Sequence, residues 1–426
     1  MQLFEEVSNF NQELKLTRSG SFVDNMSLPI HRWFRYSAGF SAEWVEQLLK
    51  EWDISEAFRV LDPFAGSGTV SLTCDKIGVQ SVSIEAHPFV ARICNAKLSW
   101  TLCVEKAQKL YKKICDEATK HSGEMHYPDL IIRSFDEDIL AVLDSYRKAW
   151  ILYDDKSPES EFIWLGITSI LRQCSKAGTA QWQYILPNKT KKKIMHPVHA
   201  FQNQIEMMLF DIRWMQRNVE KSKTTLVLGD ARECASLVEN KINAVITSPP
   251  YANNYDYADS LRFEMTFWGE INGWGDIHEK VRKKLIVSSS QHSSKERLNI
   301  ENLLHNPIIK PILPELEEIV TDLAKIRENR GGKKHYHTMI AAYCCDIGKV
   351  IHNLRKICKR NSRMCWIIGD SAPYGVYCPI DKWIGEIALS AGFTSYQFEK
   401  IRDRNVKWKN RKHDIPLKEG RLWIYG

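Results

Sequence analysis

Two short segments of the chain combine residue types that could hold a cofactor and act on an amino group. Residues 61–70 read Leu-Asp-Pro-Phe-Ala-Gly-Ser-Gly-Thr-Val, and residues 247–251 read Thr-Ser-Pro-Pro-Tyr. A glycine-rich turn after a strand lets backbone approach a ligand closely. A corner fixed by two prolines presents oxygen acceptors beside an aromatic ring. The first segment therefore predicts a nucleotide-like cofactor, and the second predicts a planar substrate that carries an amino group.

The spacing around the glycine turn narrows the choice of cofactor. Glu85 closes the next predicted strand, 17 residues after Gly68, where an acidic side chain accepts hydrogen bonds from ribose hydroxyls. The glycines do not follow the G-x-G-x-x-G pattern, and no phosphate-binding lysine follows them. S-adenosylmethionine, which has no phosphate, therefore fits better than a dinucleotide or a triphosphate. A tight strand-to-helix turn without any ligand is the alternative.

The second segment suits methyl transfer to an exocyclic amine. The lone pair of such an amine is delocalised into its ring, so the enzyme needs acceptors that draw on the N–H bonds. Ser248 and the carbonyl of Pro249 can be those acceptors, and the prolines fix the backbone at little entropic cost. Tyr251 offers a flat face on which an extruded base can stack. This chemistry needs no metal, and we interpret the sequence His-Tyr-His at 335–337 as a loop rather than a metal site.

Composition limits the class of protein. The chain has 426 residues, of which 44% are hydrophobic and 26% are charged, as in ordinary soluble globular proteins. Its net charge of +7 permits a polyanionic partner. The 11 cysteines include no C-x-x-C pair, which favours reduced thiols over a zinc ribbon or a disulfide framework. Because we find neither a signal-peptide pattern nor an apolar run of membrane length, we expect a cytoplasmic protein without membrane contact.

Hydrophobic periodicity predicts alternating strands and helices in the parts of the chain that carry the motifs. A helix capped by Ser41 is expected over 41–52, and further helices over 69–77, 339–354 and 383–391. Strands are expected at 58–61, 80–85, 225–230, 242–247, 365–368, 395–401 and 422–425. This order predicts an α/β fold with a Rossmann-like, doubly wound, mostly parallel sheet.

Two breaks in this rhythm indicate insertions. Residues 101–216 show helical periodicity and no clear strand, and residues 269–334 are polar and charge-rich. We therefore divide the chain into a cofactor-binding half of the core, a helical insertion, core strands with the catalytic corner, a polar basic insertion and a C-terminal part of the core. Their bounds are 1–100, 101–220, 221–268, 269–337 and 338–426.

Together these motifs resemble the S-adenosylmethionine-dependent DNA amino-methyltransferases, which methylate the exocyclic nitrogen of cytosine or adenine. The resemblance covers the core and not the insertions. It implies a class I methyltransferase core, S-adenosylmethionine as cofactor, double-stranded DNA as partner, a cognate restriction endonuclease as a candidate second partner, and a place at the nucleoid. It assigns catalysis to Ser248, Pro249, Pro250 and Tyr251. It assigns cofactor binding to Asp62, Pro63, Phe64, Gly66, Gly68, Thr69, Glu85, Asp230, Phe40 and Ser41.

Some of these assignments have plain structural alternatives. Residues 31–41 look like the family's N-terminal cofactor-binding segment, but they could also be an aromatic lead-in to a capped helix. Asp230 follows its strand as the family's adenine-side acid does, and a surface turn is the alternative. Residues 366–371 look like the segment that flanks the target pocket, and residues 401–409 resemble the family's final hairpin region. In the latter, a solvated basic hairpin is the alternative to a phosphate contact.

The target base and the recognition element are less constrained. Serine at position 248, in place of Asp or Asn, is associated in the family with N4 of cytosine. N6 of adenine is the runner-up, an RNA or tRNA base is third, and a DNA-binding protein without turnover is a fourth alternative. The cofactor loop precedes the catalytic corner, yet the long insertion comes earlier than the family's recognition domain would. Its aromatic and basic residues, at 182–184 and 188–193, compete with residues 282–334 for contact with DNA.

Overall fold

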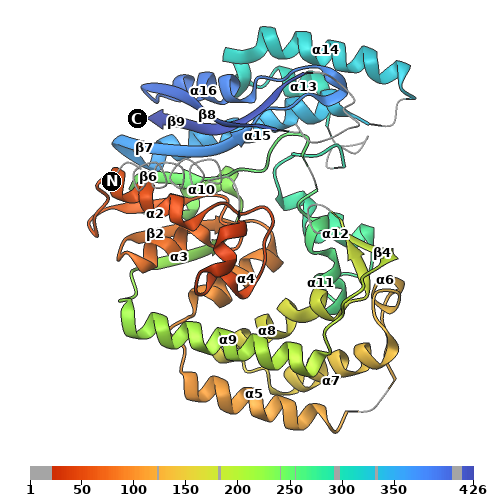
Figure 1. The fold of residues 1–426 in the computed structure, drawn as a ribbon. Coiled ribbons are helices and arrows are strands. Elements are labelled where there is room, and N and C mark those ends of the chain that lie inside the picture. The colour runs from red at the N-terminus through yellow and green to blue at the C-terminus, as the bar shows by residue number, and fades with distance from the viewer. Residues whose placement is uncertain are drawn as a thin grey trace, which may run out of the picture.

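The computed structural model describes residues 22–121, 124–180, 184–239, 241–254, 256–291, 298–331, 334–404 and 415–426. A seven-stranded sheet with the order β5-β2-β1-β6-β7-β9-β8 forms its centre (Figure 1). Strands β5, β2, β1, β6 and β7 are parallel, and β9 is antiparallel to both of its neighbours. The strands are β1 (Arg59–Asp62), β2 (Gln80–Glu85), β5 (Thr224–Leu228), β6 (Ile242–Thr247), β7 (Cys358–Gly369), β8 (Ser395–Arg404) and β9 (Leu417–Tyr425). The predicted doubly wound, mostly parallel sheet is confirmed, and its order is that of a class I methyltransferase core.

Alternate residues of the central strands bury opposite faces of the sheet, as the period of two in a strand requires. In β1, Val60 packs with α2 (Ala42–Glu51) and α3 (Thr69–Lys76), whereas Leu61 packs with the helices of the other face. Those helices are α10 (Cys234–Leu237), α15 (Tyr336–Ile357) and α16 (Ile380–Ser390). Both faces are therefore covered, which is why the strands read as apolar runs.

The first insertion builds a second, helical core that also includes α4 (Pro88–Leu98). Its helices are α5 (Val104–Ala118), α6 (Asp129–Ile132), α7 (Glu137–Tyr153), α8 (Pro158–Cys174) and α9 (Pro197–Asn218). The expectation of no strand in this segment is wrong, because β3 (Ala177–Thr179) and β4 (Ile185–Thr190) pair as an antiparallel hairpin. Within β4 only Ile185 is buried, so the hairpin has no apolar alternation by which the sequence could indicate it.

The second insertion is more regular than its polar composition suggests. It contains α12 (Trp274–Lys280), α13 (Ile300–Leu304) and α14 (Leu313–Asn329). Helix α14 buries Leu316, Val320 and Leu323 in the core that includes α15. The expected loop at 335–337 is also wrong, because His335 precedes α15 directly and residues 336–337 form its first turn.

Short elements complete the fold. They are η1 (Val23–Ser27), η2 (His31–Trp33), η4 (Ala231–Glu233), η5 (Asp259–Leu261), α11 (Arg262–Phe267), η6 (Arg282–Lys284), η7 (Pro307–Ile312) and η8 (Pro373–Gly375). In Figure 1, α14 and the helical layer of α5, α7 and α9 lie at opposite ends of the molecule, with the sheet between them. Across the described part of the chain, every helix is too short or too polar to span a bilayer.

Candidate active site

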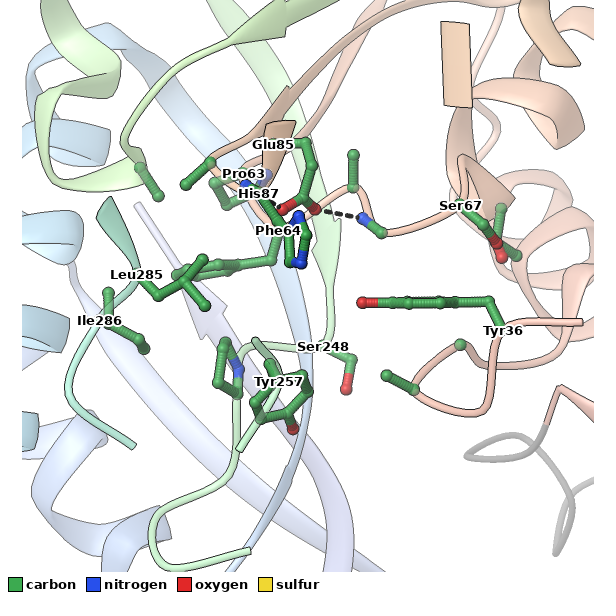
Figure 2. A pocket seen from close by; sticks show the side chains of 18 of the residues that line it. Tyr36, Pro63, Phe64, Ser67, Glu85, His87, Ser248, Tyr257, Leu285 and Ile286 are labelled. Atoms are coloured by element: carbon green, nitrogen blue, oxygen red, sulfur yellow. Dashed lines mark hydrogen bonds between the residues drawn. The ribbon is translucent and has the colours of Figure 1, made fainter. Parts of the chain in front are cut away.

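A pocket lies at the carboxyl ends of β1, β2 and β6, where the strand order reverses and open α/β sheets bind their ligands. The space between its walls is about 730 Å³, part of it open to solvent. Figure 2 shows its labelled side chains converging from segments far apart in the sequence. Its wall comprises Tyr36, Ala38, Gly39, Phe40, Pro63, Phe64, Ala65, Gly66, Ser67, Thr69, Glu85, Ala86, His87, Asp230, Ala231, Ser248, Pro250, Tyr257, Lys284, Leu285 and Ile286.

The turn after β1 is held by two carboxyl groups. Asp62 is fully buried, and its Oδ1 accepts hydrogen bonds from the Phe64 backbone N–H (3.0 Å) and from Thr247 Oγ1 (2.6 Å). Glu85 Oε2 accepts the Gly66 N–H (2.8 Å), and Oε1 accepts the N–H of residue 87 (2.8 Å). Burial raises the pKa of Asp62 to about 7, and it likewise raises the pKa of Glu85 to about 7 against the effect of the two N–H donors.

Both glycines of the turn are required by geometry. Gly66 has φ +52° and Gly68 has φ +89°, a left-handed conformation that side chains disfavour. A Cβ on Gly66 would lie 2.8 Å from Tyr36 Cε1, and one on Gly68 would lie 2.7 Å from Cys94 Sγ. The turn is therefore packed against side chains from two other segments.

Several polar atoms around the pocket have no partner in the described residues. They are Asp62 Oδ2, Ser67 Oγ and both ring nitrogens of His87. Buried polar groups normally make hydrogen bonds, so unpaired groups that surround a cavity are suited to a polar ligand. Together with Glu85 they fit a compound with ribose hydroxyls and amino-acid groups, as S-adenosylmethionine has. Of these residues, Ser67, Glu85 and His87 are on the pocket wall, and Asp62 lies behind it.

The N-terminal segment reaches the pocket because the helical insertion holds it. Asp211 of α9 accepts hydrogen bonds from the Ile30 N–H (3.1 Å), from Arg32 Nε (3.0 Å) and from Trp33 Nε1 (3.1 Å). Lys97 of α4, also buried, donates to the carbonyl of His31 (3.0 Å). The chain then continues as residues 36–40, which form one wall of the pocket.

The expected cofactor residues divide into two groups. Phe40, Pro63, Phe64, Gly66, Thr69, Glu85 and Asp230 line the pocket. Asp62 and Gly68 lie behind the wall and shape the turn, while Ser41 caps α2 by accepting the Trp44 N–H (3.3 Å). Asp230 forms an ion pair with Arg232 (2.6 Å), so its carboxylate is already partly neutralised.

The catalytic corner follows β6 directly and meets the same pocket. Ser248 and Pro250 line it, whereas Pro249 is buried and Tyr251 lies behind them. Ser248 Oγ donates to the carbonyl of Ile367 in β7 (3.1 Å). Because the hydroxyl proton is used in this bond, the oxygen lone pairs remain available to accept N–H groups.

Two tyrosines share the corner. The ring of Tyr251 packs against the sheet, and the Arg404 guanidinium lies 5.1 Å from its centroid. Arg404 is held in turn by the carbonyl of Asp370 (2.7 Å). Tyr257 lines the pocket, beside Ser248 in Figure 2, and its hydroxyl accepts the Tyr251 N–H (3.2 Å). The ring that borders the pocket next to Ser248 is therefore that of Tyr257.

The sequence did not single out some of these residues. His87 follows Glu85 by two positions, and this closeness to the strand end was a usable signal. Tyr257 and the wall formed by Leu285 and Ile286 gave none, because they reach the pocket only through the tertiary fold. Of the segments expected near the target, Trp182, Gln183 and residues 405–409 lie outside the described residues.

Comparison with known proteins finds similarity to type II methyltransferases, although no family model matches the chain. The type II methyltransferase M.BsoBI of Geobacillus stearothermophilus is 25% identical over 452 aligned positions, which cover 95% of this chain and 85% of that protein. The type II methyltransferase M.AvaI of Nostoc sp. is 25% identical over 91% of this chain and 87% of its own length. M.MjaII of Methanocaldococcus jannaschii is 20% identical over 51% of this chain and 39% of its own length.

Over most of its length the chain is similar to type II methyltransferases, which agrees with the resemblance of its motifs to the S-adenosylmethionine-dependent DNA amino-methyltransferases. S-adenosylmethionine is accordingly the expected cofactor of this methyltransferase, and the unpaired polar groups around the pocket fit it. The activity of the family is DNA methylation, and the relatives' type II designation places it in a restriction-modification context.

Proposed function

We propose that this methyltransferase methylates N4 of an extruded cytosine in double-stranded DNA. S-adenosylmethionine, when bound, supplies the methyl group on a sulfonium centre. One observation carries the proposal: Ser248 of the catalytic corner borders the same pocket as Gly66 and Glu85. An amino group held at Ser248 would therefore lie next to the cofactor.

Ser248 and Pro249 would act on the amino group as acceptors. The Ser248 hydroxyl donates its proton to the Ile367 carbonyl, so its oxygen faces other donors as an acceptor. The Pro249 carbonyl is a second acceptor, and Pro250 contributes no N–H that would compete for it. Two acceptors drawing on the N–H bonds return electron density to the nitrogen, and their effect is greatest as the nitrogen becomes tetrahedral.

The extruded base would be held by aromatic rings. We assign stacking to Tyr251, as the family resemblance implies, together with Tyr257 on the pocket wall. Since Arg404 already lies over the Tyr251 ring, a base must either stack on the opposite face or displace the guanidinium.

The hairpin of β3 and β4 is the element that we assign to DNA contact. Tyr184, which directly precedes β4, accepts the N–H of Asp256 (2.9 Å), which follows the catalytic corner by five residues. The strand and the segment after it carry exposed Lys189, Lys192 and Lys193. These lysines can neutralise phosphates next to the target base. The competing segment, 282–334, contributes instead to the cofactor wall and to the packing of α14 on α15.

The choice of cytosine rests on Ser248, and N6 of adenine is the alternative. The deciding experiment incubates the protein with S-adenosylmethionine carrying a deuterated methyl group and with unmethylated DNA or RNA, then identifies labelled nucleosides by mass spectrometry. We expect N4-methylcytosine from DNA. Labelled N6-methyladenine alone would transfer the proposal to adenine, and labelled RNA alone would refute the DNA assignment.

A matched pair of variants ties the product to the corner. Ser248→Ala removes the proposed acceptor, whereas Ser169→Ala removes a hydroxyl that also donates to a backbone carbonyl, in α8. We expect loss of labelled product only for Ser248→Ala.

A further inference from the structure

A buried histidine on the pocket wall makes no side-chain hydrogen bond with the described residues. The side chain of His87 is 2% exposed, and neither ring nitrogen has a partner among the described residues. The residue precedes α4 as its N-cap, yet its side chain makes no capping hydrogen bond with the described chain. His196, in the same position before α9, does accept such a bond, from the N–H of Val198 (3.4 Å). The imidazole of His87 therefore does not cap α4, although the residue stands at the N-cap position.

The surroundings keep this imidazole neutral. Burial lowers the pKa of His87 to about 4, and the charge of Lys284 acts in the same direction, against that of Asp256. A neutral imidazole has one N–H donor and one acceptor nitrogen. Both are unpaired in a low-dielectric pocket, which is an unfavourable state that a ligand with hydroxyl or ring-nitrogen groups would relieve.

The location of the ring identifies which part of a ligand it meets. The backbone N–H of His87 donates to Glu85 Oε1 (2.8 Å), so the two residues share one end of the pocket. In Figure 2 the ring lies beside Phe64 and Glu85, on the side opposite Ser248 and Tyr257. The end with Glu85 is the one expected to receive ribose hydroxyls.

We propose that His87 binds the adenosine half of the cofactor, with one ring nitrogen donating and the other accepting a hydrogen bond. This inference rests on the proposed function for the nature of the ligand. It adds a neutral, bifunctional contact to the acidic one made by Glu85.

Calorimetry with two ligands tests the proposal on the full chain. S-adenosylhomocysteine contains adenosine and the amino-acid part, whereas 5′-deoxy-5′-methylthioadenosine lacks the amino-acid part. We expect His87→Ala to lower the affinity for both ligands by a similar factor of about ten or more, since a tenfold change in affinity is a usual effect of losing buried hydrogen bonds. A loss confined to S-adenosylhomocysteine would overturn the assignment to adenosine.

Two further variants separate hydrogen bonding from packing. His87→Asn keeps a donor and an acceptor, and we expect it to recover part of the affinity. His87→Phe fills the volume without polar atoms, and we expect it to bind as weakly as His87→Ala. Wild-type affinity in His87→Phe would overturn the proposal.

Thermal unfolding of the cofactor-free variants supplies a readout that a structural role would move. We expect His87→Phe to unfold at or above the wild-type temperature, because it removes unpaired buried polar atoms. A marked drop would instead identify His87 as a structural residue and overturn the proposal. Failure of the wild-type protein to bind either ligand would refute the proposed function itself, which distinguishes the two failures.

Discussion

Replacement of Gly66 by alanine tests whether the turn after β1 shapes the cofactor pocket. The residue has φ +52°, and a non-glycine residue in the left-handed region costs about 1–2 kcal/mol. The new methyl group would also lie 2.8 Å from Tyr36 Cε1, closer than van der Waals contact permits. Tyr36 is buried between the turn and the pocket, at 8% exposure, so it can yield only by moving within the pocket wall.

The alternative to moving Tyr36 is a shift of the turn itself. Such a shift would lengthen the hydrogen bond from the Gly66 N–H to Glu85 Oε2, now 2.8 Å, and forfeit about 1 kcal/mol. Either response displaces a group that lines the pocket. We therefore expect Gly66→Ala to lower the affinity for S-adenosylhomocysteine by about tenfold or more, which is equivalent to about 1.4 kcal/mol of binding free energy.

Gly331→Ala is the matched control, because it carries the same backbone strain without the contact. Gly331 has φ +72°, and among the described residues no atom lies within 4 Å of its added Cβ. Calorimetry with S-adenosylhomocysteine, with thermal unfolding alongside, compares the two variants. We expect both to lower thermal stability and only Gly66→Ala to lower affinity. Wild-type affinity in Gly66→Ala would refute the argument that this turn borders the cofactor.

Four further predictions concern the corner, the rings, the pH dependence and the DNA surface. Ser248→Ala should lower the single-turnover methylation rate by about tenfold or more while leaving S-adenosylhomocysteine affinity unchanged in calorimetry, and an equal loss of both would contradict its role as an acceptor. Tyr257→Ala and Tyr251→Ala should each slow methylation by the equivalent of about 1–3 kcal/mol, whereas Tyr257→Phe, which keeps the ring, should cost less in the same assay. Burial raises the pKa of Glu85 to about 7, and ribose hydroxyls donate best to a carboxylate. The affinity for S-adenosylhomocysteine should therefore rise as the pH increases from 6 to 8. Glu85→Gln should flatten this pH dependence, whereas Asp62→Asn, the control for the neighbouring acid, should retain it. Replacing Lys189, Lys192 and Lys193 by glutamine should weaken DNA binding and reduce the slope of log affinity against log salt by up to about 3, and an unchanged slope would remove the β3–β4 hairpin from the DNA surface.

Local sequence signals were sufficient to predict the elements of the core. The glycine turn, the alternation in β2 and the apolar run of β6 each depend on residues within one segment, and all three elements formed where expected. Their placement at one edge of the sheet follows from the parallel order of the strands. This order brings residues at strand ends, such as Glu85 and Ser248, to one pocket.

The remaining parts of the site depend on contacts between distant segments. Asp211 binds the backbone of Ile30 across 181 positions, and Ser248 Oγ binds the Ile367 carbonyl across 119. No periodicity or turn signal reports such contacts. The sequence did not predict the β3–β4 hairpin, because its strands are short and β4 has a single buried residue. Sequence patterns predicted that Tyr251 belongs to the corner, but only packing could show that the ring of Tyr257 borders the pocket next to Ser248.

The helical insertion connects the two halves of the proposed reaction. Through Asp211 the helix α9 holds the segment that carries Tyr36 and Phe40 into the cofactor pocket. Through Tyr184 the hairpin of the same insertion contacts the loop that follows the catalytic corner. An insertion that served DNA recognition alone would have no reason to bury a carboxylate against the cofactor segment. Asp211 is fully buried and accepts hydrogen bonds from Ile30, Arg32 and Trp33, so we expect loss of this carboxylate to disturb the segment that leads into the cofactor pocket. We therefore expect the insertion between β2 and β5 to support the cofactor site as well as to contact DNA.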